Sequence, residues 1–499
     1  MSFMFWNCKN LSSLDLTNFN TTKVEDMSGM FSSCQKLSSL TLSESFNTAN
    51  VTDMSNMFSY CNMLEKLNLS NFNTTKVEDM SYMFYMCQKL TELNLSNFNT
   101  EKVKKMSCMF SYCSMLEKLN LSNFNTAEVT NMSGMFYGCY KLPSLNLSNF
   151  NTAKVTNMSQ MFYTCKELPS LDLTNFNTAK ATNMQEMFKG CSTLQTIYVS
   201  DNFVVTGITD ENYKKDLFTG CEALPEYGDA KTSSDYANYK TGYFTKLVVR
   251  NGDERYGIKG ETTQLTVDNL VLADNKDFVA YDPFKATAAS YNRTINTTWA
   301  TLCLPFEVSL TDQHFRAFKL LSADEGTNTV ELEELKTSIA AGTPVIIKMK
   351  DGETQLKFSV ANKAIAKDVQ TSESANGNYQ LQGLYTQKEF SKDADNNCYI
   401  VKGNKLMNPA KLLANTKVTK VVSKPFRAYM VDNTSAPTAG AKMFSIGFDN
   451  DGTTAIDTIN TIANDKAEYY DLQGKRLNEP QKGINIVKRG GKTMKVIIK

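Results

Sequence analysis

Hydrophobic and polar positions in the first part of the chain repeat every 26 residues. One unit, residues 54–79, reads MSNMFSYCNMLEKLNLSNFNTTKVED, and the next unit begins at Met80. Phenylalanines mark the period at Phe46, Phe72, Phe98, Phe124, Phe150 and Phe176. A repeat of this length indicates a solenoid, because one unit cannot bury its own apolar face but stacked neighbours can.

Each unit has two halves with different periodicity. In the first half, apolar residues lie at offsets 0, 3, 4, 7 and 10, as in Met132, Met135, Phe136, Cys139 and Leu142. This spacing predicts one face of a helix, and Asn131 suits its N-cap. In the second half the period changes to two, which predicts a short strand with inward leucines. The eight expected strands are centred near Leu14, Leu40, Leu67, Leu93, Leu119, Leu145, Leu171 and Ile197.

A helix, a strand and a turn in 26 residues fit the leucine-rich-repeat pattern L-x-x-L-x-L. The usual asparagine position holds Phe150, flanked by Asn149 and Asn151. Both asparagines are expected to bond backbone groups of the turn in stacked ladders. A degenerate unit near Tyr213 ends the array, so the solenoid is expected to cover residues 1–245.

One cysteine stands at the same place in each unit, which indicates a packing position. Helix axes about 8–10 Å apart would separate neighbouring cysteines beyond disulfide reach, so buried free thiols are expected. The recurring positions are Cys8, Cys34, Cys61, Cys87, Cys113, Cys139, Cys165 and Cys191.

The rest of the chain lacks the repeat. Residues 246–448 contain short β-rich runs separated by turn residues, which predicts an all-β sandwich-like domain, with a jelly roll as one such arrangement. Residues 449–465 are polar and are expected to be a linker. Residues 466–499 are expected to form a small C-terminal β segment with a hairpin across Arg489-Gly490-Gly491. The predicted fold class is thus an α/β leucine-rich-repeat solenoid followed by these two β regions.

Composition excludes several classes of function. The net charge of +1 gives no reason to expect a nucleic-acid partner, and no apolar stretch reaches the ~18 residues of a membrane span. The single histidine, His314, removes most histidine catalysis and most zinc sites. Glu331, Glu333 and Glu334 could serve a glycosidase but read more simply as the solvent face of a strand. We therefore expect a non-enzyme without catalytic residues, cofactor or metal.

The start of the chain, MSFMFWNCKNL, matches later repeat segments and has neither part of a signal peptide. We read the chain as beginning inside a repeat, with a truncated N-terminus, so this start says little about compartment.

Residues between the leucines of each strand are expected to face outward on a concave surface. One row holds Ser13, Ser39, Lys66, Glu92, Lys118, Ser144 and Ser170, and the other holds Asp15, Thr41, Asn68, Asn94, Asn120, Asn146 and Asp172. These rows are either a solvated face or a groove whose weak contacts add up along the array. The candidate ligand-binding residues are Asn68, Asn94, Asn120, Asn146, Asp172, Lys66 and Lys118.

The unit VTNMSGMFYGCYKLPSLNLSNFNTA resembles the repeats of BspA-like leucine-rich-repeat surface proteins over residues 1 to about 245. TWATLCLPFEV, AGTPVIIKMK and FRAYMV resemble a β-rich domain of secreted proteins from anaerobic Gram-negative bacteria. The tail from Tyr469 is similar to C-terminal secretion and sorting domains, although Asn485 stands where an aromatic residue is usual. The resemblance implies export to the cell surface or medium, and binding to a host extracellular-matrix protein or to other bacteria.

Three hypotheses about function remain. The first is a non-enzymatic surface or secreted adhesin that binds a matrix protein, a bacterial surface component or a glycan through the repeat array. The second is a carbohydrate-binding or carbohydrate-active surface protein, and the third is a passive spacer.

Overall fold

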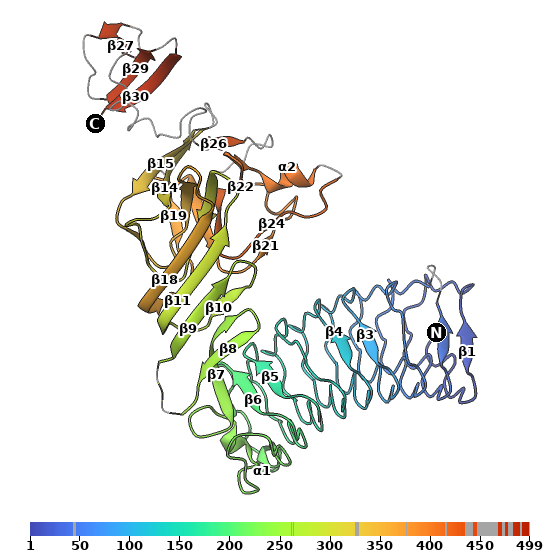
Figure 1. The fold of residues 1–499 in the computed structure, drawn as a ribbon. Coiled ribbons are helices and arrows are strands. Elements are labelled where there is room, and N and C mark those ends of the chain that lie inside the picture. Colours follow the sequence, from blue (N-terminus) through green and yellow to red (C-terminus); the bar gives the residue numbers. More distant parts are fainter. Residues whose placement is uncertain are drawn as a thin grey trace. The chain divides into compact units, whose positions relative to one another are not determined.

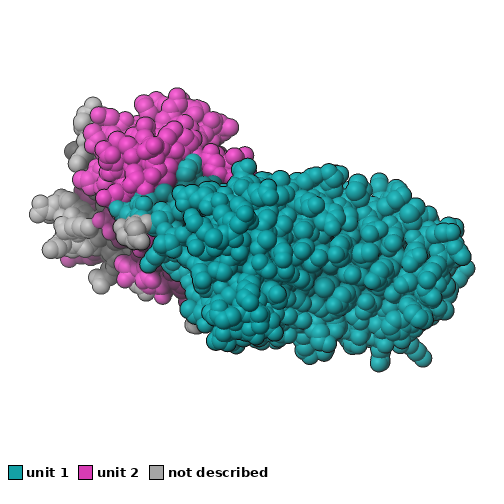
Figure 2. Space-filling view, turned by 90° about the horizontal axis from the view of Figure 1, so that it is seen from below, with its two compact units in different colours: residues 1–248, 255–265 teal, residues 249–254, 266–499 magenta. Residues whose placement is uncertain are grey.

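The computed structural model describes residues 1–42, 46–260, 262, 264–324, 329–375, 377–414, 417–434, 443–446, 468–471, 475–477, 483–489 and 492–498. The chain divides into two compact units, unit 1 with residues 1–248 and 255–265, and unit 2 with residues 249–254 and 266–499 (Figures 1 and 2). The expected boundary at 245/246 falls inside strand β7 (Phe244–Asn251), whose residues are divided between the units. The expected linker, 449–465, lies outside the described residues.

Unit 1 is a stack of coils, but the predicted repeat helices are wrong. Among the described residues, α-helix is confined to α1 (Glu211–Lys214) and α2 (Pro409–Leu413), with one 3₁₀ turn, Ser234–Tyr236. The segments expected as helices are successions of turns (Figure 1). The residues two and six places after the first methionine of a unit have positive φ, for example 60° at Gly134 and 69° at Gly138. A right-handed helix requires negative φ at every residue, so it cannot pass through these positions.

Backbone hydrogen bonds show what replaces the helix. Alternate N–H groups donate to the next coil, as from Phe136 to the Met161 carbonyl at 2.9 Å. The N–H groups between them close local turns, as from Met135 to the Met132 carbonyl at 3.2 Å. Bonds between coils of this kind indicate a rise near the ~4.8 Å of neighbouring β-strands, and not the ~8–10 Å of packed helices.

The buried positions predicted from the spacing are confirmed although their conformation is not. Met132, Met135, Phe136, Cys139 and Leu142 are all fully buried. The phenylalanines of successive units stack nearly parallel, with ring centroids 5.7 Å apart between Phe110 and Phe136. A single apolar core therefore runs through the coils of unit 1.

Six of the eight expected strands form. They are β1 (Ser13–Asp15), β2 (Ser39–Thr41), β3 (Glu92–Asn94), β4 (Lys118–Asn120), β5 (Ser170–Leu173) and β6 (Thr196–Val199). β1 pairs with β2, β3 with β4, β5 with β6, and β6 with β7, all in parallel. β8 (Glu254–Ile258) also pairs with β7.

The segments around Leu67 and Leu145 are not strands. Two prolines explain the second interruption. At the start of β4 the Glu117 N–H donates to the Thr91 carbonyl of the preceding coil. Pro143 and Pro169 hold the position of Glu117 in the next two coils. Proline has no N–H, so the coil of Leu145 lacks this bond to the coil before it and to the coil after it. Nothing in the structure explains the interruption at Leu67.

The turn after each strand is held by the asparagines, as predicted. The Asn149 amide donates to the carbonyls of Leu121, Ser122 and Phe124 at 2.8–3.1 Å. The Asn151 carboxamide oxygen accepts the Ala153 N–H at 3.1 Å. The ladders thus satisfy backbone groups between and within coils.

The described residues of unit 2 form mainly strands, and the largest sheet among them has ten. Their order is β12 (Trp299–Leu302), β17 (Val345–Met349), β14 (Phe315–Asp324), β15 (Thr329–Leu335), β26 (Phe444–Ile446), β23 (Lys405–Met407), β22 (Cys398–Lys402), β25 (Arg427–Asp432), β20 (Tyr379–Leu384) and β19 (Thr371–Glu373). A second sheet holds β18 (Gln355–Ile365), β11 (Phe284–Thr294) and β9 (Thr266–Ala273). Shorter pairs are β13 (Val308–Ser309) with β16 (Ser338–Ile339) and β21 (Lys388–Glu389) with β24 (Val422–Ser423), while β10 (Phe278–Ala280) pairs with β7.

The ten-stranded sheet corrects the expectation of two separate sheets face to face. β12 contacts β22 and β25, and β14 contacts β20, so the sheet folds back on itself. Trp299, Phe318, Leu381 and Met430 lie in the core between these strands. β26 joins the two parts, because it pairs with both β15 and β23. The sheet is therefore a continuous half-barrel.

At the end of the chain, β27 (Glu468–Tyr470) pairs with β28 (Arg476–Leu477) and with β29 (Gly483–Arg489). β29 pairs antiparallel with β30 (Lys492–Ile498), in agreement with the predicted hairpin. In the part of the chain that is described, no helix is long and apolar enough to cross a membrane.

Candidate binding face of the repeat array

The strand face of unit 1 presents a row of identical polar side chains. Alternation along β3 turns Leu93 inward, whereas Asn94 on the same strand is exposed. β3 and β4 pair in register, which places Asn94 directly beside Asn120. Asn68 and Asn146 are also exposed, at the same position of their own coils. The structure therefore places these four predicted residues as expected, and we call them the asparagine row.

Each side chain of the asparagine row also closes a turn. The Asn94 Oδ1 accepts the Ser96 N–H at 3.1 Å, and the Asn120 Oδ1 accepts the Ser122 N–H at 3.1 Å. Asn68 and Asn146 make the same bond, at 3.0 and 3.1 Å. This Asx turn uses the carboxamide oxygen. A ligand would consequently meet the amide group as a hydrogen-bond donor.

The other three predicted residues differ from the asparagine row. Asp172 is half-buried, accepts bonds from Thr174, and pairs with Arg255 at 3.0 Å. Its carboxylate is thus engaged within unit 1. Lys66 is exposed and lies 3.9 Å from the Glu92 carboxylate, while Lys118 is exposed and in register beside Glu92. Three charged residues of alternating sign therefore lie next to the asparagine row.

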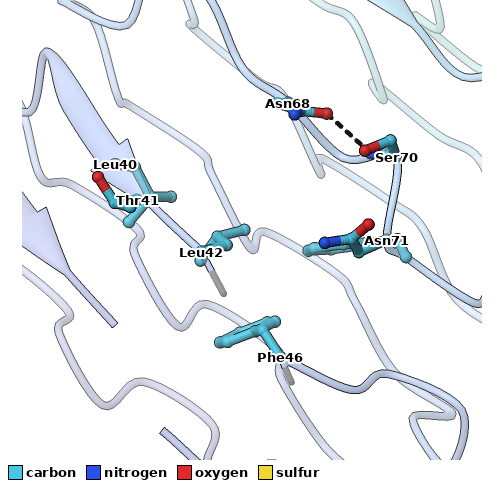
Figure 3. A pocket seen from close by; sticks show the side chains of 8 residues that line it. Leu40, Thr41, Leu42, Phe46, Asn68, Ser70 and Asn71 are labelled. Atoms are coloured by element: carbon cyan, nitrogen blue, oxygen red, sulfur yellow. Dashed lines mark hydrogen bonds between the residues drawn. The ribbon is translucent and has the colours of Figure 1, made fainter. Parts of the chain in front are cut away.

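A small cavity opens beside the first residue of the asparagine row. Its volume is about 180 Å³, and its lining includes Leu40 and Thr41 of β2 together with Asn68 and Phe72. Figure 3 shows these side chains and the bond between Asn68 and Ser70. The cavity coincides with the interruption at Leu67, where β2 has no strand partner on this side. Its size suits a small group of a ligand and not a whole substrate.

The repeat cysteines are free thiols, and all but the exposed Cys8 are buried. The reason given by helix spacing is wrong, because the coils are closer than packed helices. Instead each buried repeat thiol donates to the carbonyl of a phenylalanine in the preceding coil, as from Cys139 to Phe110 at 3.3 Å. Burial raises the pKa of Cys139 to about 12. A neutral thiol is a poor nucleophile, so this row is structural.

The carboxylates weighed for glycosidase chemistry are occupied in the sheet. Glu334 binds Arg316 through both oxygens at 2.8 Å, which lowers the pKa of Glu334 to about 2. Glu331 accepts from Ser322, and Glu333 pairs with Lys319 at 2.9 Å. His314 is exposed and lies 3.1 Å from Glu353. No group of metal-binding side chains is present among the described residues.

The first half of the chain is therefore not the expected α/β solenoid but a stack of turn-rich coils with a polar strand face. A protein family described as "Mycoplasma protein of unknown function, DUF285" matches residues 1–118 and 86–203. Among solved structures, the chain is similar to a leucine rich cell surface protein from Faecalibacterium prausnitzii. The two are 15% identical over 44% of this chain and 84% of the other, with a TM-score of 0.19. No curated protein matches the chain.

Proposed function

We propose that the chain is a non-enzymatic interaction protein that acts at the bacterial surface or after secretion. The observation that carries the proposal is the asparagine row, in which the same exposed side chain recurs on a scaffold that holds it by a backbone bond. Because the row is ordered before binding, a ligand loses little free energy in ordering it. Weak contacts at successive coils add up along an extended partner.

The partner class that we propose is a host extracellular-matrix protein or another cell-surface component. The asparagine amides can donate to the backbone carbonyls of a polar, extended polypeptide. The charges of Lys66, Glu92 and Lys118 lie next to these donors. The resemblance of the repeats to surface proteins supports the location.

The test replaces Asn94, Asn120 and Asn146 together by aspartate. Aspartate keeps the oxygen that closes each Asx turn but removes the amide donor, so the fold is retained. Glutamate is a poorer choice, because its longer side chain would not close the turn. We expect the 499-residue chain to bind at least one purified matrix protein on an immobilised panel, and the triple variant to lose roughly tenfold or more in affinity.

One control variant and one contrary outcome complete this test. Ser144→Asp on the neighbouring row adds a charge without touching the asparagine row, so it should change the affinity by less than about threefold. Binding that survives in the triple variant, with an unchanged melting temperature, would place the site elsewhere.

A further inference from the structure

A second surface of unit 1 lies on the turns that replaced the expected helices. It comprises the residues two, five and six places after the first methionine in the coils that begin at Met54, Met80, Met106, Met132 and Met158. We call it the tyrosine stripe, because it holds Tyr60, Tyr82, Tyr85, Tyr112, Tyr137 and Tyr163. Rings on neighbouring coils lie 4.4–6.2 Å apart between centroids, from Tyr60 to Tyr163. The stripe is thus a continuous aromatic band across five coils.

Four of the fifteen positions of the tyrosine stripe are buried, namely Ser59, Ser111, Gly134 and Gly138. None of the other eleven carries a charge, although charged residues make up 21% of the chain. The stripe ends in the following coil, where Glu186 and Lys189 occupy the same positions and pair at 2.6 Å. Tyr60 and Tyr82 are each 38% exposed, and the other four tyrosines of the stripe are half-buried. Accessible aromatic side chains without charge mark a surface that a neutral ligand can cover.

The backbone under the stripe leaves little for a ligand to bind. The Tyr60 N–H donates to the Tyr85 carbonyl at 2.7 Å, and the Tyr112 N–H donates to the Tyr137 carbonyl at 2.6 Å. A peptide therefore cannot join this face as an added strand, which requires free backbone groups. Recognition has to come from the rings and their hydroxyls. Burial and the neighbouring Tyr60 hydroxyl raise the pKa of Tyr85 to about 12, so its hydroxyl remains a donor at neutral pH.

The stripe repeats at the rise of the coils, about 4.8 Å. Linear β-1,4-linked polysaccharides have nearly the same distance from one sugar to the next, are often uncharged, and present C–H faces and hydroxyls in alternation. We infer that the tyrosine stripe binds a neutral β-1,4-linked glycan along the array, about one sugar per coil. Tyr137 and Tyr163 stack face to face, so the stripe presents ring edges there. These edges pack against the sugar C–H groups, and the tyrosine hydroxyls bond the sugar hydroxyls. This inference does not depend on the asparagine row, which lies on the strand face.

The inference is tested by titrating the 499-residue chain with chitohexaose and cellohexaose in a calorimeter. We expect binding to one or both, with affinity rising from the disaccharide to the hexasaccharide because more coils are engaged. An α-1,6-linked glucan of the same length should bind at least about tenfold more weakly, because its repeat does not match the coils. Absence of binding to both β-1,4-linked hexasaccharides would overturn the inference.

Variants are chosen from residues that the repeat itself accepts. Serine stands at the position of Tyr85 and Tyr137 in other coils, for example at Ser59 and Ser111. Tyr85→Ser with Tyr137→Ser should therefore keep the melting temperature within a few degrees and weaken hexasaccharide binding roughly tenfold or more. Unchanged binding in this folded variant would overturn the inference, as would loss of binding to a matrix protein with no effect on the glycan.

The triple aspartate variant of the asparagine row separates the two proposals. It should bind the hexasaccharide with the affinity of the unmodified chain. A loss there would show that the glycan lies on the strand face and would overturn the assignment to the tyrosine stripe.

Discussion

At the scale of single residues, bonds from one coil to the next decide which side chains the repeat uses. Thr152 is fully buried, and its hydroxyl donates to the Asn177 carbonyl at 2.9 Å while it accepts the Asn177 N–H at 2.9 Å. The sequence pattern did not single out this threonine. Its partner lies 25 residues away, and the periodicity of one unit does not show which backbone groups of the next unit will need a bond.

Thr152→Val tests this role with almost no change in shape. Valine leaves the partly buried N–H and C=O of Asn177 without their partner, which should lower the free energy of unfolding by about 2 kcal/mol. Thr156→Val is the matched control, because the Thr156 hydroxyl is exposed and bonds only the Thr130 carbonyl at 3.3 Å. The control should cost less than about 1 kcal/mol in urea titrations. Equal costs for both variants would contradict the proposed bridge.

At the scale of elements, the sequence predicted which residues are buried but not the conformation that buries them. Offsets of 0, 3, 4, 7 and 10 suit a helical face, and they equally suit turns whose alternate residues bond the next coil. One signal could have distinguished the two. Gly134, Gly138 and Gly190 stand two or six places into the expected helices, where glycine is unfavourable by about 1 kcal/mol, whereas glycine suits positive φ. The strands followed from the period of two, except around Leu145, where Pro143 and Pro169 remove ladder bonds, and around Leu67, where no cause is seen.

The direction in which one substitution changes the stability distinguishes a turn from a helix. At Gly138 φ is 69°, and an added Cβ would lie 3.0 Å from the Tyr112 ring. Gly138→Ala should therefore lower stability by about 1–2 kcal/mol, whereas in a helix interior it would raise stability by about 1 kcal/mol. Gly228→Ala is the control, because φ is not positive there and a Cβ would meet nothing within 4 Å. A higher melting temperature for Gly138→Ala would favour the helix.

At the scale of the whole molecule, unit 1 combines one row of buried repeat cysteines, which we call the thiol row, with two outward surfaces, the asparagine row and the tyrosine stripe. The asparagine row could be predicted, because strand alternation fixes which side chains face outward. The tyrosine stripe could not, because a helix would have spread the same residues over a different surface. The thiol row was predicted from the constant place of cysteine in the repeat. The bonds from these thiols to phenylalanine carbonyls, such as that from Cys139 to Phe110, were not predicted, because they depend on the small distance between successive coils.

The thiol row makes unit 1 sensitive to alkali. Burial raises the pKa of Cys34 to about 11 and of Cys139 to about 12, and it also raises the pKa of Cys61, Cys87 and Cys113. In the unfolded chain a thiol ionises near pH 8.5–9. Above about pH 8.5 the thiols of the folded state therefore keep their protons, whereas the thiols of the unfolded state release them. The resulting stability is fully present below about pH 8.5 and is lost as the pH rises toward 11–12.

Within this window, each buried thiol should lower the free energy of unfolding by up to about 1.4 kcal/mol per pH unit. Several thiols together therefore make the fall steep. Urea midpoints of unit 1, measured by circular dichroism on the full chain with reductant, should be nearly constant from pH 7 to 8 and fall sharply above pH 9. A variant with Cys113→Ala and Cys139→Ala should be less stable at pH 7, because cavities remain, but its stability should fall less steeply with pH. The difference in slope removes the contribution of tyrosines and lysines, which both proteins share. Equal slopes in the two proteins would show that the buried thiols do not govern the alkaline transition.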